Sequence, residues 1–198
     1  SPNYDKAGPI LPDIVLFDAS YFDMPPAEAA IMDPQQRLLL ECATAALDDA
    51  GYPGEKYAGR IGAFVGKGTN FYLYEHLIGN QELALNADML GVLSLNEPDY
   101  AATLVSYKLG LTGPSLSINT ACSTSLVAVH MACRSLISSR ECEIAIAGGV
   151  TLSSTVSPSG YIHIDGHITS PDGYCRAFAD DANGCVFGSG VGLVVLKP

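Results

Sequence analysis

The chain has 198 residues, and its 21 Asp and Glu outnumber its 10 Lys and Arg to give a formal net charge of −11. This acidic balance argues against a nucleic-acid-binding protein, because a phosphate backbone attracts clustered basic residues. Hydrophobic residues make up 48% of the chain and charged residues 16%, so the composition also excludes a disordered segment. No apolar run approaches the about 20 residues that a membrane helix needs, and we expect no membrane partner.

The sparse charge and the 20 Gly predict a chain that buries much of its surface, for example against a partner chain or domain. The N-terminus has neither Met nor the layout of a signal peptide. We therefore expect residues 1–198 to be a piece of a longer chain.

The clearest predicted helix follows an irregular, Pro-rich stretch over residues 1–32. Asp33 is a suitable N-cap, Pro34 suits the first helical position, and Gly51 is expected to end the helix. The apolar stripe that should face the core consists of Leu38, Leu39, Cys42, Ala45, Ala46 and Leu47.

Three more elements are expected before the middle of the chain. Residues 60–66 are short, apolar and β-rich, which predicts a strand, and residues 71–78 predict a helix. A further helix is predicted over 97–109, with Asn96 as its N-cap and Pro98 in its first turn.

The second half of the chain starts with a short predicted strand over 116–119 that leads at once into a helix ending near residue 138. This helix is apolar on nearly every side and is predicted to be buried. A buried strand over 143–150, a short helix near 158–166 and a long strand over 186–196 complete the prediction. Helices that alternate with apolar strands indicate a layered α/β fold.

Cys122 lies where the strand over 116–119 turns sharply into the helix. The positive end of the helix dipole and the unpaired N–H groups of a helix start favour a thiolate, which is the nucleophilic form of cysteine. The same N–H groups can stabilise the oxyanion that forms when a thioester carbonyl is attacked. Position alone favours a small buried residue over a nucleophile at Cys122, because cysteines are often buried.

The six cysteines show no CxxC spacing and no compact secreted framework. Cys42 and Cys133 fall among aliphatic neighbours in helical patterns, where a free cysteine acts as a small hydrophobe. We therefore expect reduced thiols in a cytoplasmic protein.

The segment around Cys122 resembles the active-site signature of β-ketoacyl synthases, specifically the ketosynthase domains of modular type I polyketide synthases. Other segments resemble further blocks of that family, in the family's order and over nearly the whole chain. The blocks are 32–41 (MDPQQRLLLE), 106–115 (SYKLGLTGPS), 119–130 (NTACSTSLVAVH), 147–150 (AGGV), 170–173 (SPDG), 175–178 (CRAF) and 187–190 (FGSG) through Lys197.

The resemblance implies an α/β thiolase-like fold, in which two similar halves, each with a five-stranded mixed sheet, stack around central helices and usually dimerise. Residues 1–198 would be the N-terminal β-ketoacyl synthase region, a layered mixed sheet with a buried central helix, without the opening strand and the C-terminal half. The implied partners are an acyl carrier protein and acyl and malonyl-type thioesters.

By the same resemblance, Cys122 accepts the acyl chain from the phosphopantetheine of the carrier protein. Two histidines of the second half then support the decarboxylative Claisen condensation that extends the chain. The chain itself would need no metal or redox cofactor, since phosphopantetheine belongs to the carrier.

The sequence departs from the family pattern at several positions. Both family histidines would lie beyond Pro198. Ala179 stands where the family usually has Asp, and Asn119 where Asp is also common, close enough to Cys122 to tune it.

None of the four histidines present replaces those of the family. His130 lies two helical turns past Cys122 and is expected to be a core or helix-contact residue, and His76 is expected at the surface. His163 and His167 have an i, i+4 spacing, but Gly166 separates them and no third ligand is evident, so we expect no metal site.

Two Gly-rich segments carry no nucleotide signature. The glycines of 188–192 are followed by a strand rather than a helix, and 66–69 (GKGT) lacks the Walker spacing.

Two alternatives stay open beside the polyketide condensing enzyme. The chain could be a non-catalytic piece, either a split half that needs a complementing chain or a scaffold. It could also be a fatty-acid condensing enzyme, which the block over 32–41 disfavours.

Overall fold

The computed structural model describes residues 3–8, 11–80, 88–153 and 160–198. The longer helices are α1 (Pro26–Ile31), α2 (Pro34–Asp49), α4 (Met89–Asn96), α5 (Ala101–Lys108) and α6 (Thr124–Arg134). Short 3-10 turns occupy Gly54–Lys56, Pro98–Tyr100 and Ala121–Ser123, and π-helical turns occupy Leu73–Leu77 and Ser135–Ser139. The strands are β1 (Tyr4–Asp5), β2 (Ile61–Lys67), β3 (Ser115–Ser117), β4 (Ile144–Thr151), β5 (Tyr161–Ile162) and β6 (Gly190–Leu196).

Among the described residues, a mixed sheet has the strand order β3-β2-β4-β6. β2 pairs in parallel with both β3 and β4, whereas β6 runs antiparallel to β4. The carboxyl ends of β2, β3 and β4 therefore meet at one edge of the sheet, together with the amino end of β6.

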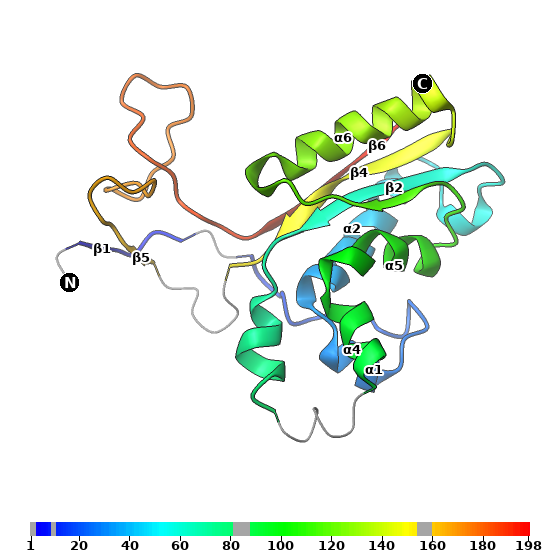
Figure 1. The fold of residues 1–198 in the computed structure, drawn as a ribbon, viewed down its shortest axis with the longest axis horizontal. Helices are drawn as coiled ribbons and strands as arrows, with labels where there is room; N and C mark the ends of the chain where they lie inside the picture. The colour runs from blue at the N-terminus through cyan, green and yellow to red at the C-terminus, as the bar shows by residue number, and fades with distance from the viewer. Residues whose placement is uncertain (1–2, 9–10, 81–87, 154–159) are drawn as a thin grey trace.

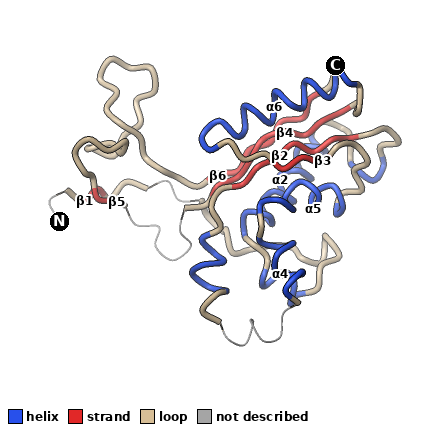
Figure 2. Tube along the Cα trace, viewed as in Figure 1, coloured by secondary structure: helices blue, strands red, loops and turns tan. Residues whose placement is uncertain are grey.

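Helices cover both faces of this sheet (Figure 1). α2 and α5 pack on one face, and α6 lies along the other, over β2 and β4. The colours of Figure 2 show the resulting helix–sheet–helix layers, which confirm the predicted layered α/β fold. β1 and β5 form a separate two-stranded ladder that extends away from the sheet.

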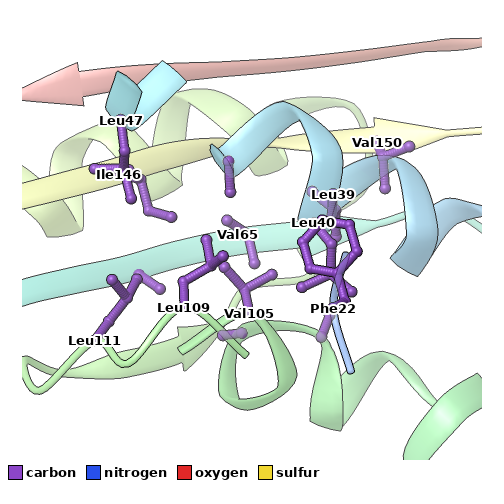
Figure 3. Packing of buried hydrophobic residues seen from close by; sticks show 14 of the residues in the cluster. Phe22, Leu39, Leu40, Leu47, Val65, Val105, Leu109, Leu111, Ile146 and Val150 are labelled. Atoms are coloured by element: carbon purple, nitrogen blue, oxygen red, sulfur yellow. The ribbon is translucent and has the colours of Figure 1, made fainter. Parts of the chain in front are cut away.

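The larger hydrophobic core lies between the sheet and α2 and α5 (Figure 3). Leu39, Leu40 and Leu47 of α2 point toward Val65 of β2 and Ile146 of β4, and all five side chains are almost completely buried. Burial of each such side chain contributes about 1.5–3 kcal/mol relative to exposure, which fixes α2 on the sheet.

α2 begins and ends where the sequence predicts. The Asp33 side chain accepts a hydrogen bond from the backbone N–H of Gln35 (2.9 Å), and Gly51 adopts φ = +79° after the last turn. The predicted stripe is shifted, because Ala45 is exposed and Ala43 is buried instead.

Several boundaries differ from the predictions. Asn96 is the last residue of α4 and not the N-cap of a helix over 97–109, because its side chain donates to the carbonyls of Ile31 and Val92 (2.8 and 2.9 Å). α1 forms within the stretch expected to be irregular, and β6 begins four residues later than predicted.

The helix predicted near 158–166 is wrong for the part of this range that the structure describes, where residues 161–162 form β5. Residues 158 and 159 lie outside the described residues.

α6 is covered on one side only. Ala128 and Ala132 are fully buried against β2 and β4, together with Phe64. Leu126 of α6 is 77% exposed, and Ile137, in the π-helical turn that continues the helix, is 68% exposed. The predicted burial on every side is therefore wrong for the described residues, because the sheet covers one face of the helix and nothing described here covers the other.

Candidate active site

Cys122 lies at the edge of the sheet where the parallel strands end. The chain leaves β3, makes the 3-10 turn Ala121–Ser123, and enters α6 at Thr124. Ala121 adopts φ = +52°, a left-handed conformation that costs a non-glycine residue on the order of 1 kcal/mol. This sharp turn places Cys122 at the start of the helix, as predicted, and the structure shows its side chain exposed.

Hydroxyl groups hold the turn around Cys122 in place. The Thr124 hydroxyl donates to the carbonyl of Ala121 (2.8 Å) and accepts from the N–H of Thr120 (3.0 Å). The Ser123 hydroxyl donates to the carbonyl of Thr120 (2.8 Å). These hydroxyl groups therefore shape the loop that carries Cys122.

An open cavity of about 630 Å³ borders Cys122, a size typical of small-molecule sites. Its walls come from the ends of all the strands that meet at this edge. The lining residues are Gly66, Lys67, Gly68, Thr69, Asn119, Ala121, Cys122, Thr124, Ser125, Gly149, Val150, Thr151 and Gly190.

A buried ion pair lies beneath one wall of this cavity. The Lys67 ammonium is 2.6 Å from Oδ2 of Asp33, and the two side chains are 0% and 2% exposed. Burial lowers the pKa of Lys67, and the charge of Asp33 opposes this shift. The sequence did not predict this pair, and its one local signal is a lysine at the end of an otherwise apolar strand.

A family model for the N-terminal domain of β-ketoacyl synthases matches residues 1–198. The chain belongs to the β-ketoacyl synthase family. The family resemblance seen in the sequence is thereby confirmed.

The curated relatives of this ketosynthase chain include components of mycobacterial polyketide synthases. One phenolphthiocerol/phthiocerol polyketide synthase subunit of Mycobacterium tuberculosis (strain H37Rv) is 45% identical over 205 residues, covering 100% of this chain and 14% of its own length. A second polypeptide of the same synthase is 44% identical over 195 residues, covering 97% of this chain and 12% of its own length. The chain thus spans only a small part of the length of these relatives.

Solved ketosynthase structures share the fold. Ketosynthase twelve of the bacillaene polyketide synthase of Bacillus amyloliquefaciens superimposes with a TM-score of 0.89 at 34% identity, covering 100% of this chain and 34% of that one. The ketosynthase of module 1 of the bacillaene synthase of strain FZB42 gives a TM-score of 0.78 at 33% identity, covering 99% and 35%. The predicted thiolase-like α/β fold is confirmed.

The histidines of this chain lie outside the Cys122 cavity. His130 is exposed on α6, and Nδ1 of His163 is 3.0 Å from the carbonyl oxygen of Thr169. In the described part of the chain, no three His, Cys, Asp or Glu side chains gather as a metal site requires.

The helices within the described ranges are also too short or too polar to cross a membrane.

Proposed function

We propose that this chain is the nucleophile-bearing, N-terminal part of a condensing enzyme of polyketide biosynthesis, with Cys122 as the acyl acceptor. The observation that carries the proposal is the exposed Cys122 at the start of α6, beside a cavity at the carboxyl edge of the sheet. The mycobacterial relatives, which are polyketide synthase subunits, favour this function over a fatty-acid condensing enzyme.

The acyl donor is the phosphopantetheine thioester of an acyl carrier protein. The sulfur of Cys122 attacks the thioester carbonyl, a new C–S bond forms, and the bond to the pantetheine sulfur breaks. The proton of Cys122 ends on the released pantetheine thiol. Ser123 makes no side-chain capping bond to the first turn of α6, so its hydroxyl does not compete with an oxyanion for the N–H groups there. The N–H of Thr124 is already bonded to the carbonyl of Ala121.

Residues 1–198 form one structural unit of a larger catalytic domain in this proposal, which acts in the cytoplasm and as a homodimer. The exposed apolar side of α6 supports a second half that packs against it, and the second half supplies the two histidines used in condensation. β6 pairs with β4 on one side and with no other described strand, which supports an opening strand on its free side.

The test is acylation of the full-length protein that carries this chain, with an acyl N-acetylcysteamine thioester as the donor. Mass spectrometry of the peptides is expected to place the acyl group on Cys122, and Cys122→Ala is expected to abolish it. Cys175 is the matched control because it is also exposed, and Cys175→Ala is expected to leave labelling unchanged. Labelling that persists in Cys122→Ala contradicts the proposal.

The non-catalytic alternative is tested by separating loading from condensation. The 198 residues alone are expected to form no β-ketoacyl product with malonyl-carrier protein, because acid–base and oxyanion groups of this kind each contribute about 10²–10⁴-fold in rate. The full-length protein is expected to form the product. A full-length protein that neither loads nor condenses would be a scaffold.

A further inference from the structure

Lys67 ends β2 with its side chain on the face of the sheet that α2 covers. Ala63 and Val65 of the same strand belong to the core under α2 and α5, whereas Phe64 belongs to the core under α6. Because successive side chains of a strand alternate between faces, Lys67 lies with Ala63 and Val65, away from α6. The Lys67 side chain therefore lies behind the cavity wall, on the face of the sheet opposite α6.

The partners of Lys67 are buried acceptors from two helices. Its ammonium donates to Oδ2 of Asp33, the N-cap of α2 (2.6 Å), and to the carbonyl oxygen of Asn96 at the end of α4. Buried ion pairs are often no more stabilising than apolar residues of similar volume. A pair of this kind beside a functional cavity therefore calls for another role.

Asp33 is linked to the backbone of the cavity wall through Gln35. The Gln35 amide donates to Oδ2 of Asp33 (3.1 Å) and to the carbonyl of Thr69 (3.1 Å), and its oxygen accepts from the N–H of Leu152 (3.3 Å). Gln35 thus joins the segment after β2, which lines the Cys122 cavity, to Leu152, which directly follows the cavity-lining end of β4 at Val150 and Thr151.

The backbone of Lys67 is linked in turn to the Cys122 loop. With its amide nitrogen facing the carbonyls, Asn119 donates to the carbonyl oxygen of Lys67 (3.2 Å), and the N–H of Ile118 donates to the carbonyl of Val65 (2.9 Å). Asn119 stands three residues before Cys122. Lys67, at the end of β2, therefore forms the ion pair with its side chain and contacts the loop before Cys122 with its backbone carbonyl.

We propose that Lys67, paired with Asp33, is a positioning residue for Cys122: the pair fixes the end of β2, and Asn119 passes this constraint to the nucleophile loop. The proposal rests on the proposed function of Cys122 as acyl acceptor. Lys67 does not touch the reacting atoms. It acts by holding the loop that does, and a displacement of such a group by about 1 Å can cost about a hundredfold in rate.

The test measures the second-order rate at which iodoacetamide alkylates Cys122 in the full-length protein, read by peptide mass spectrometry well below the melting temperature. Lys67→Met is expected to slow this rate by about tenfold, and to lower kcat of acyl loading with KM unchanged. Leu47→Ala is the matched control, because Leu47 is buried at the far end of α2 and its truncation destabilises the fold without reaching the site. Leu47→Ala is expected to leave the alkylation rate unchanged.

Asn119→Ala tests the link to the loop with an exposed side chain that the core does not need. It is expected to slow alkylation of Cys122 with an unchanged melting temperature. In the Lys67→Met/Asn119→Ala double variant, the two effects are expected not to multiply, because both remove the same constraint. If Lys67→Met alone does not fold, the double variant Lys67→Met/Asp33→Asn replaces it. This variant removes the unpaired carboxylate and keeps an N-cap on α2. The effect of Asn119→Ala on alkylation is then measured with and without these two substitutions.

The proposal is overturned if Asn119→Ala leaves the alkylation rate unchanged, if the two effects multiply, or if Leu47→Ala slows alkylation as much as Lys67→Met. Alkylation does not depend on acyl transfer. A wild-type protein that fails to acylate therefore overturns the proposed function, and the alkylation series still decides the role of Lys67.

Discussion

The Asp33 carboxylate accepts from the backbone N–H of Gln35 as the cap of α2, from the Gln35 side-chain amide, and from the buried ammonium of Lys67. Asp33→Ala removes the cap and leaves a buried charge unpaired, so it is expected to lower the free energy of unfolding by about 3–5 kcal/mol. Asp88→Ala is the matched control, because Asp88 caps α4 at an exposed position. It is expected to cost about 1 kcal/mol. Urea denaturation measures both, and equal losses would show that the ion pair adds nothing to the cap.

Asp172 offers a residue-level prediction on pH. Hydrogen bonds lower the pKa of Asp172 from 3.8 to about 2, and those from the Arg176 guanidinium contribute more than the one from the Ser170 hydroxyl. Its folded pKa lies below its unfolded value, so its stabilising contribution is complete above pH 3.8 and is lost as the pH falls toward 2. Arg176→Met is expected to raise the pKa of Asp172 toward 3.8 in a carbon-13 NMR titration.

The control for this titration is Asp181→Asn, which removes the other carboxylate paired with Arg176 (3.2 Å). It leaves the Arg176, Ser170 and Tyr174 hydrogen bonds to Asp172 in place, and the pKa of Asp172 is expected to stay about 2. A pKa that stays about 2 in Arg176→Met would assign the shift to Ser170 instead.

The residues of the site could be predicted from the sequence only where they are contiguous. Cys122 and its small neighbours follow one another in a single turn, and that turn was predicted. Lys67 and Asp33 are 34 positions apart, and nothing in the local pattern of either residue indicates the other. Their contact follows from the packing of α2 on β2, which sequence periodicity does not specify.

Gly66 of β2 lies in close contact with Ile118 and with Thr124 at the start of α6, because it has no Cβ. A Cβ at this position would overlap the carbonyl oxygen of Ile118 and the side-chain methyl of Thr124. Gly66→Ala is therefore expected to cost about 1–3 kcal/mol of stability, as overpacked positions do, and to slow acylation of Cys122 by displacing its loop. Gly79→Ala is the control, since nothing lies within 4 Å of its Cβ position. Calorimetry measures the melting temperature of each variant. If Gly66→Ala and Gly79→Ala have the same melting temperature and the same acylation rate, this role of Gly66 is contradicted.

Element boundaries were predicted best where a cap is local. Asp33 and Gly51 mark the ends of α2 through bonds and dihedral angles within a few residues. Asn96 was wrongly predicted to cap a following helix, because its side chain bonds instead to the carbonyl of Val92 within α4 and to that of Ile31, 65 positions away. The apolar sequence of α6 likewise indicates that both sides of the helix prefer an apolar environment, although only one side meets the sheet in the described residues.

At the scale of the whole molecule, the order of the strands assembles the site. The parallel strands β2, β3 and β4 bring their carboxyl ends to one edge, which is where ligands bind in open α/β sheets. The cavity therefore collects residues from four separate parts of the sequence beside Cys122. The alternation of helices and strands predicted the layers, but the strand order and the antiparallel pairing of β6 required the structure.

The exposed side of α6 predicts the behaviour of residues 1–198 as an isolated chain. Leu126 of α6 is 77% exposed and Ile137 of the π-helical turn that continues it is 68% exposed, on a chain with only 16% charged residues. Large exposed apolar patches promote association. We expect the isolated chain to self-associate in sedimentation and to bind a hydrophobic dye, and the double variant Leu126→Glu/Ile137→Glu to lose most of both properties.

Val15→Glu/Leu16→Glu is the matched control for this experiment. These side chains are 74% and 64% exposed outside α6, so the control changes net charge and apolar exposure by similar amounts. It is expected to leave association and dye binding near those of the unmodified chain. If both double variants reduce association equally, added negative charge explains the effect, and the α6 surface has no special part in it. If only the α6 variant does so, the same substitutions in the full-length protein are expected to weaken its assembly, because the surface that drives association of the isolated chain is then the one against which the proposed second half packs.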